Sequence, residues 1–144
     1  MATLLAHISV VPGKEASFER IAAELYRHTH ADEAAVRRYE YWRGAEPGTY
    51  YCLESFPDLL GFIAHQSSDH HEAAGTQFAG MFASLRLEWV DPLAQASPLA
   101  ATNPAELPAD ASELARRYHA QYGSVLAEWW LALRAVSDPP EESH

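Results

Sequence analysis

Three histidines, His65, His70 and His71, lie within seven residues of one another in the segment 57–75, PDLLGFIAHQSSDHHEAAG. An imidazole changes charge near neutral pH, so it can serve as an acid, a base or a metal ligand. The residues alone allow three interpretations. In the first, the three are ordinary histidines at the core margin and at a helix start. In the second, they form a metal site with Glu72. In the third, one of them is a base at the mouth of an apolar cavity.

The spacing of these histidines argues against the metal site. Two ligands on one helical face are three or four residues apart, whereas His65 and His70 are five apart across a predicted break at 67–69. We therefore expect no metal. A histidine base needs a fold that places a cavity beside it. The elements around the histidines therefore decide whether such a base is possible.

Two short helices are predicted to carry the histidines. Pro57 and Asp58 open the first helix, because proline suits a first helical turn and a carboxylate suits the positive end of the helix dipole. This helix should end near residue 66, with His65 at the edge of its apolar face. The second helix should run from near residue 70 to near Phe82, after a capping segment at 67–69.

The rest of the first ninety residues predicts a small sheet. Period-two alternation favours strands at 3–11, 35–43, 50–56 and 83–90, and period-four apolar spacing favours a helix over 14–31. The order strand, helix, strand, strand, helix, strand is that of an α+β, ferredoxin-like split βαβ fold. Its first and third strands are central, and its helices cover one face of the antiparallel sheet.

The other face of this sheet is predicted to be a mixed polar and aromatic surface. The residues expected to project from it are His7, Arg86, Glu88, Glu54 and a ring such as Tyr39 or Tyr41. Antiparallel sheets tolerate a solvated face. We nevertheless expect a second copy of the chain to cover it, as a homodimer.

Composition excludes several partners. Twenty acidic residues against ten basic ones give a formal net charge of -10, which repels nucleic acid. The single cysteine, Cys52, excludes an internal disulfide and is expected to be a small buried residue of the third strand. No apolar run approaches the length of a membrane span, and the start lacks a basic leader region. We expect a soluble, cytoplasmic protein that binds no membrane.

The chain after residue 92 is predicted to be an appendage. Residues 93–109 are rich in proline and alanine and predict a linker. A helix should span 110–137, opened by Asp110 with Glu113 three residues later, and its apolar stripe must cover its own domain or a partner subunit. It could add a dimer contact or close over the pocket. The end, 138–144, is expected to be disordered.

One part of the sequence resembles the antibiotic biosynthesis monooxygenase family. The resemblance runs over residues 1–92. It rests on the opening ISVVPG, on LESF closing the third strand, and on the F-x-x-H pair Phe62 and His65 followed five residues later by His70. It implies ferredoxin-like chains that pair through their sheets into a dimeric α/β barrel. It also implies a pocket between the sheet and the helices of each chain.

The resemblance implies a chemistry as well. Some members oxidise quinols or polycyclic phenols with molecular oxygen and without metal or flavin. The implied function is a cofactor-independent monooxygenase acting on a quinol-like or polyketide-derived aromatic, with His65 as base or hydrogen-bond partner and His70 as second candidate. The implied wall residues, for each of which ordinary core is the alternative, are Trp42, Tyr51, Phe62, Phe78, Phe82 and Trp89.

Two other functions were weighed. A non-enzymatic dimer that binds a small hydrophobic ligand, or that assists a pathway enzyme, would have the same fold. Related haem-degrading enzymes use an asparagine, a tryptophan and a histidine. At the corresponding positions this chain has Ala6, His65 and Gly75 instead. The sequence departs from that pattern, so we expect neither haem nor haem degradation.

Overall fold

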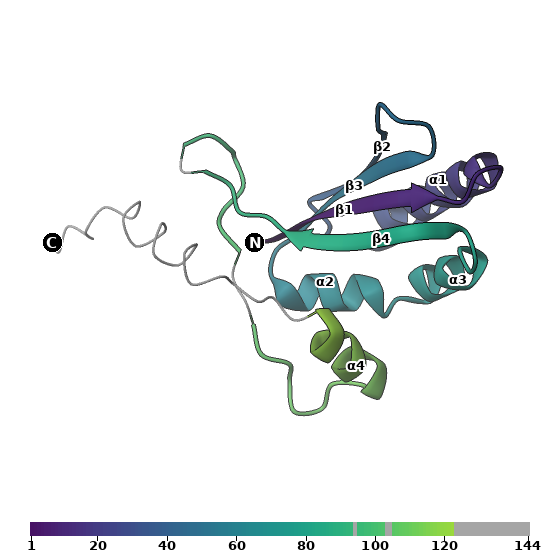
Figure 1. Cartoon of the computed structure of the whole chain (residues 1–144). Coiled ribbons are helices and arrows are strands. Elements are labelled where there is room, and N and C mark those ends of the chain that lie inside the picture. Colours follow the sequence, from purple (N-terminus) through teal and green to yellow (C-terminus); the bar gives the residue numbers. More distant parts are fainter. Residues whose placement is uncertain (94, 103–104, 123–144) are drawn as a thin grey trace, which may run out of the picture.

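The computed structural model describes residues 1–93, 95–102 and 105–122, and these form a four-stranded antiparallel sheet with helices (Figure 1). The strands are β1 (Ala2–Val10), β2 (Arg38–Arg43), β3 (Thr49–Phe56) and β4 (Phe82–Trp89). Their order in the sheet is β2-β3-β1-β4. The predicted split βαβ arrangement, with the first and third strands central, is confirmed.

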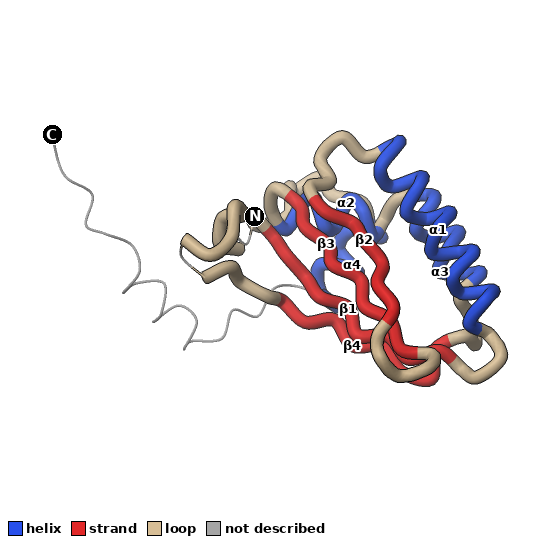
Figure 2. The backbone as a smooth tube through the Cα atoms, turned by 90° about the horizontal axis from the view of Figure 1, so that it is seen from above, coloured by secondary structure: helices blue, strands red, loops and turns tan. Residues whose placement is uncertain are grey.

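Helices cover one face of this sheet (Figure 2). They are α1 (Glu15–Asp32), α2 (Leu59–Gln66) and α3 (Asp69–Gln77), and a later helix, α4 (Glu113–Tyr122), packs on α2. The predicted caps of the two short helices are present. Asp58 accepts a hydrogen bond from the Gly61 N–H at 2.9 Å, and Ser68 accepts one from the His71 N–H at 3.3 Å. Local hydrogen bonds therefore fix the starts of both helices that carry the histidines.

The core lies between the sheet and these helices. Leu4, Ala6 and Ile8 of β1 point toward the helices and are buried, as the alternation predicts. The buried face of α1 packs in the same core and consists of Phe18, Ile21, Ala22 and Leu25. Tyr26, which the spacing also placed inward, is 44 % exposed and rests against the ring of His30 at 4.3 Å.

Strand register overturns part of the predicted outer face. Glu54 pairs with Leu4 on one side and with Tyr39 on the other, so all three point toward the helices. Tyr41 follows Tyr39 by two residues and shares that side. The prediction that Glu54, Tyr39 or Tyr41 projects from the open face was wrong, because a shift of one residue in register reverses every side chain.

The ends of two helices also differ from the prediction. α3 ends at Gln77 instead of near Phe82, because Gly80 adopts a φ of +73° in the following turn and Phe82 opens β4. At the start of α4, Ser112 accepts a hydrogen bond from the Ala115 N–H at 3.1 Å, so Ser112 takes the capping role predicted for Asp110. The local sequence marked both regions but not their boundaries.

The remaining predictions for the tail lie outside the described residues. These are the part of the predicted helix beyond Tyr122 and the end 138–144. The boundaries of the linker and the appendage stay predictions. In the described part of the chain, no helix is both long enough and apolar enough to cross a membrane.

Candidate functional site

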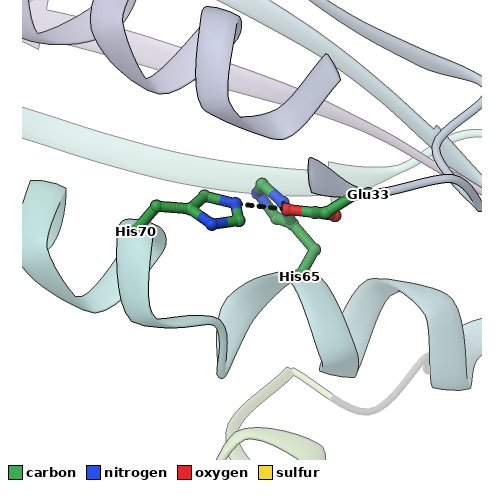
Figure 3. A group of neighbouring side chains, drawn as sticks. All are labelled: Glu33, His65 and His70. Carbon is green, nitrogen blue, oxygen red and sulfur yellow. Dashed lines mark hydrogen bonds and ion pairs between the residues drawn. The ribbon is translucent and has the colours of Figure 1, made fainter. Parts of the chain in front are cut away.

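A carboxylate joins two of the three histidines (Figure 3). Glu33 directly follows α1, His65 lies in the last turn of α2, and His70 lies in the first turn of α3. Nδ1 of His65 is 2.8 Å and Nε2 of His70 is 2.5 Å from the same oxygen, Oε1 of Glu33. The break between α2 and α3 is what turns the two rings toward a common point.

The protonation of this cluster follows from the carboxylate. Burial of Glu33 opposes its ionisation, but the hydrogen bonds and charges of His65 and His70 outweigh burial and hold its pKa below the ordinary value. An ionised carboxylate can only accept hydrogen bonds, so both ring nitrogens must donate. A neutral His65 therefore carries its proton on Nδ1, and its Nε2 has a free lone pair.

This free nitrogen is buried. His65 is 1 % exposed, and its ring lies 4.7 Å from the ring of Tyr39 and 5.2 Å from that of Phe56, measured between centroids. Nε2 has no hydrogen-bond partner among the described residues. A carboxylate that holds one imidazole nitrogen and so leaves the other as a base is the arrangement used by many hydrolytic enzymes. The geometry thus equips His65 to take a proton.

A second unpartnered polar group lies on the neighbouring strand. Glu54 of β3 is buried, and its Oε2 has no hydrogen-bond partner among the described residues. Burial raises the pKa of its carboxyl, and the charge of His65 only partly opposes that rise. A carboxyl held in its neutral form can donate a hydrogen bond to an anion. Burial thus favours the protonated form of Glu54, which can donate a hydrogen bond, whereas the unpartnered Nε2 of His65 can accept one.

The third histidine closes the cluster without joining the hydrogen bonds to Glu33. The ring of His71 lies 4.8 Å from that of His65, edge to face. Burial, followed by the charge of His65, lowers the pKa of His71 to about 3. His71 is consequently neutral at physiological pH and keeps positive charge away from His65.

The cluster also has the composition of a cation site. Its three ligand atoms, from Glu33, His65 and His70, lie within 4.8 Å of one another. One ion bound to two imidazoles at the usual 2.0–2.1 Å keeps their nitrogens no more than about 4.2 Å apart, and both must lose the proton that they donate to Glu33. The helix break removes the spacing argument against a metal. The two hydrogen bonds nevertheless account for the geometry by themselves.

The predicted wall residues fall into three groups. Phe62 and Trp89 meet at 5.3 Å in the core cluster that also contains Phe56, a neighbour of His65. Phe78 and Phe82 pack together at 5.3 Å in the other core cluster. None of these four lines the cavity between α1 and β2 or the one between α1 and α3.

Tyr51 and Trp42 form the third group. They pair with each other across β2 and β3, and Tyr51 also pairs with His7, so both belong to the open face of the sheet. Tyr51 is 39 % and Trp42 is 60 % exposed. The prediction that Tyr51 is a wall between sheet and helices was wrong in register, whereas Trp42, on an edge strand, borders a cavity between α1 and β2.

Two of the cavities in the described part of the chain lie beside α1. The larger one, of about 580 Å³, lies between α1 and β2. The smaller one, of about 100 Å³, lies between α1 and α3 and is bordered by His28 and His70. His65 borders neither. The larger cavity is therefore a feature separate from the histidine cluster.

Sequence reasoning missed Glu33 and misplaced Glu54. Glu33 stands 32 residues before His65, in a segment without periodicity, and no local signal points to it. A signal for Glu54 did exist. Glu54 lies between Cys52 and Phe56 in the alternation of β3, on the same face, and both of these neighbours are buried.

Comparison with known proteins identifies relatives of this architecture. The family model described as "Antibiotic biosynthesis monooxygenase" matches residues 1–77, more than half of the chain. A protein from Caulobacter crescentus that carries the same family name is 26 % identical, with a TM-score of 0.61 over 64 % of this chain and 89 % of the other. Comparison with curated proteins finds no match.

More distant structures share the fold. A protein from Pseudomonas aeruginosa is 20 % identical, with a TM-score of 0.60 over 64 % of this chain and 93 % of its own. A protein from Mycobacterium tuberculosis is 18 % identical, with a TM-score of 0.61 over 67 % of this chain and 98 % of its own. Both matches take in about two thirds of this chain and more than nine-tenths of the other protein.

Proposed function

The chain belongs to the antibiotic biosynthesis monooxygenase family, and from this premise we propose that it oxidises a quinol-like or polyketide-derived aromatic molecule with molecular oxygen, without metal or flavin, using His65 as the base. The observation that carries the proposal is the buried, unpartnered Nε2 of His65, whose other nitrogen is bound to Glu33. His70 holds the same carboxylate oxygen and acts as a positioning residue.

The chemistry begins with the loss of a proton. An aromatic hydroxyl or an acidic ring C–H gives its proton to Nε2 of His65, and the electron-rich anion then passes an electron to oxygen. For a ring CH₂ group the balanced outcome is a C=O group and one molecule of water. The enclosed position of His65 keeps bulk water from the reactive species, and a path beside α2 must open for the substrate to enter.

Glu54 supplies the second half of this mechanism. Burial favours the protonated form of its carboxyl, and in that form it can donate a hydrogen bond to the negative charge that develops on the substrate oxygen. We expect Glu54→Leu to lower kcat by about 100-fold, since loss of one such donor typically costs 100-fold to 1000-fold. Glu54→Gln, whose amide can still donate, should retain most of the activity. Steady-state kinetics of the two variants, side by side, check this prediction, and equal rates for both would contradict it.

Oxygen uptake tests the function itself. The purified chain is supplied with a panel of hydroquinones and anthrones, and oxygen consumption is followed with an electrode against a heat-denatured sample. We expect consumption with at least one member of the panel, one molecule of oxygen for each molecule of substrate. Binding of the same compounds without oxygen uptake would instead support the non-enzymatic, ligand-binding alternative.

Self-association through the open sheet face is the second part of the proposal. Leu5 and Leu53 pair across β1 and β3 on this face, beside the exposed rings of Tyr51 and Trp42. A second copy would cover this apolar centre together with the hydrogen bond between His7 and Glu88, 2.8 Å long, which lies beside Leu5 on β1 and β4.

A charge on this face should separate the copies. We expect the native chain to show twice its 16.0 kDa mass in light scattering and Leu53→Lys to show a single mass, because a lysine cannot be buried unpaired in such an interface. Arg20→Glu, a charge change on the exposed side of α1, serves as control. A native chain with a single mass would contradict the proposal.

A further inference from the structure

The cavity between α1 and β2 has no part in the proposed reaction. It has a volume of about 580 Å³, and five of its lining side chains are aromatic: Phe18, Tyr26, Tyr41, Trp42 and Tyr50. Small-molecule sites in proteins occupy about 300–1000 Å³ and are lined mainly by apolar and aromatic groups. The cavity thus has room for two or three fused rings and flat side chains to stack against them.

The cavity does not reach the histidine cluster, since His65 is not among its lining residues. The hydroxyl of the lining residue Tyr41 is 3.0 Å from that of Tyr39, and the ring of Tyr39 lies 4.7 Å from the ring of His65, measured between centroids. Burial raises the pKa of both hydroxyls well above the ordinary value, so both stay neutral. Tyr41 and Tyr39 thus form a series of contacts from the cavity lining to His65.

The charges around the cavity decide which ring systems it accepts. Arg43 is already occupied, because it donates to both oxygens of Glu19 at 2.8 and 2.6 Å. Tyr50 donates to the same carboxylate at 2.8 Å, and together these bonds lower the pKa of Glu19 to about 2. Glu40 brings a further carboxylate to the lining, and it accepts a hydrogen bond at 3.3 Å from Arg38, which lies outside the lining. No unpaired cation remains among the lining residues, and the chain as a whole carries a net charge of -10.

We propose that this cavity is a second binding site, which takes a flat molecule of two or three fused aromatic rings that is uncharged or carries an amino group. Aromatic acids are disfavoured, since their carboxylate would meet Glu19 and Glu40 and find Arg43 already paired. An amino group would instead lie near carboxylates and over aromatic faces, where a cation is stabilised.

A matched pair of three-ring probes tests the proposal. 9-Aminoacridine is positively charged at neutral pH and 9-anthracenecarboxylate is negatively charged, and equilibrium dialysis measures both against the full chain. We expect the amine to bind at least tenfold more tightly than the acid. Ala23→Trp, which fills the cavity from an exposed position on α1 without changing charge, should weaken the amine at least tenfold. Ala16→Trp, on the same helix but outside the lining, should leave it unchanged.

Two further measurements keep the test decisive. Trp42→Ala removes an exposed ring from the lining and should also weaken the amine, which guards against misfolding of the Ala23 variant. His65→Asn should bind the amine as the native chain does, so failure of the proposed reaction would leave this result untouched. Unchanged binding in Ala23→Trp, or equal binding of acid and amine to the native chain, would overturn the second site.

Discussion

Replacing His65 with asparagine is expected to lower the rate of oxygen consumption by about 100-fold or more, the usual contribution of a positioned general base. Asparagine is chosen because its Nδ2 lies as many bonds from Cα as Nδ1 of histidine. It can therefore keep the hydrogen bond to Glu33, which is 2.8 Å long in the native chain, while Nε2 is lost. The variant should fold, bind substrate and fail in proton removal.

The control for this experiment is His119→Asn, a histidine of α4 that lies outside the cluster. It should retain native activity. The thermal unfolding of both variants, followed by circular dichroism, shows whether the fold is intact. A His65→Asn enzyme that consumes oxygen at the native rate would remove His65 from the mechanism, and the search for the base would move to the remaining buried polar groups.

Truncating Glu33 to alanine is expected to lower the free energy of unfolding by about 3 kcal/mol at neutral pH. Two hydrogen bonds to a charged group are lost, each contributing about 1.5–3 kcal/mol, and relaxation of the exposed side recovers part of the loss. Glu33 ties the end of α1 to both short helices, α2 through His65 and α3 through His70. Urea denaturation measures the difference. Glu46→Ala, an exposed glutamate in the β2–β3 turn, should cost less than about 0.5 kcal/mol.

The effect of Glu33 should depend on pH with a definite sign. Its pKa is lower in the folded chain than the ordinary value of 4.5, so the folded state holds its proton less tightly than the unfolded state does. The stability that it contributes is fully present above pH 4.5 and is lost as pH falls through the folded pKa. The gap between the native chain and Glu33→Ala should therefore be constant from pH 5 to 7 and shrink below pH 4.5. A gap that widens in acid would contradict the assigned hydrogen bonds.

Much of the fold was predictable because its signals are local. The alternation of Leu4, Ala6 and Ile8, and the spacing around Phe18 in α1, each record burial within a few residues of sequence. The order of the elements then leaves the split βαβ arrangement as the simplest solution. The helix break after His65 also has a local signal, because capping residues such as Ser68 lie within the break itself.

The parts of the site that were missed depend on long-range pairing. Which face of β3 carries Glu54 is set by its register with β1 and β2, and a prediction without that register has two equivalent choices. The same ambiguity placed Tyr51 inside. Glu33 reaches His70 across 37 residues, a contact that no period or motif in the chain encodes.

The tautomer of His65 is the most direct test of the account. A long-range proton–nitrogen NMR spectrum of the labelled chain, at neutral pH, distinguishes a protonated ring nitrogen from a bare one. In the neutral ring we expect a proton on Nδ1, held by Glu33, and a bare Nε2 whose signal moves when a phenol is added. A proton on Nε2, with Nδ1 bare, would contradict it.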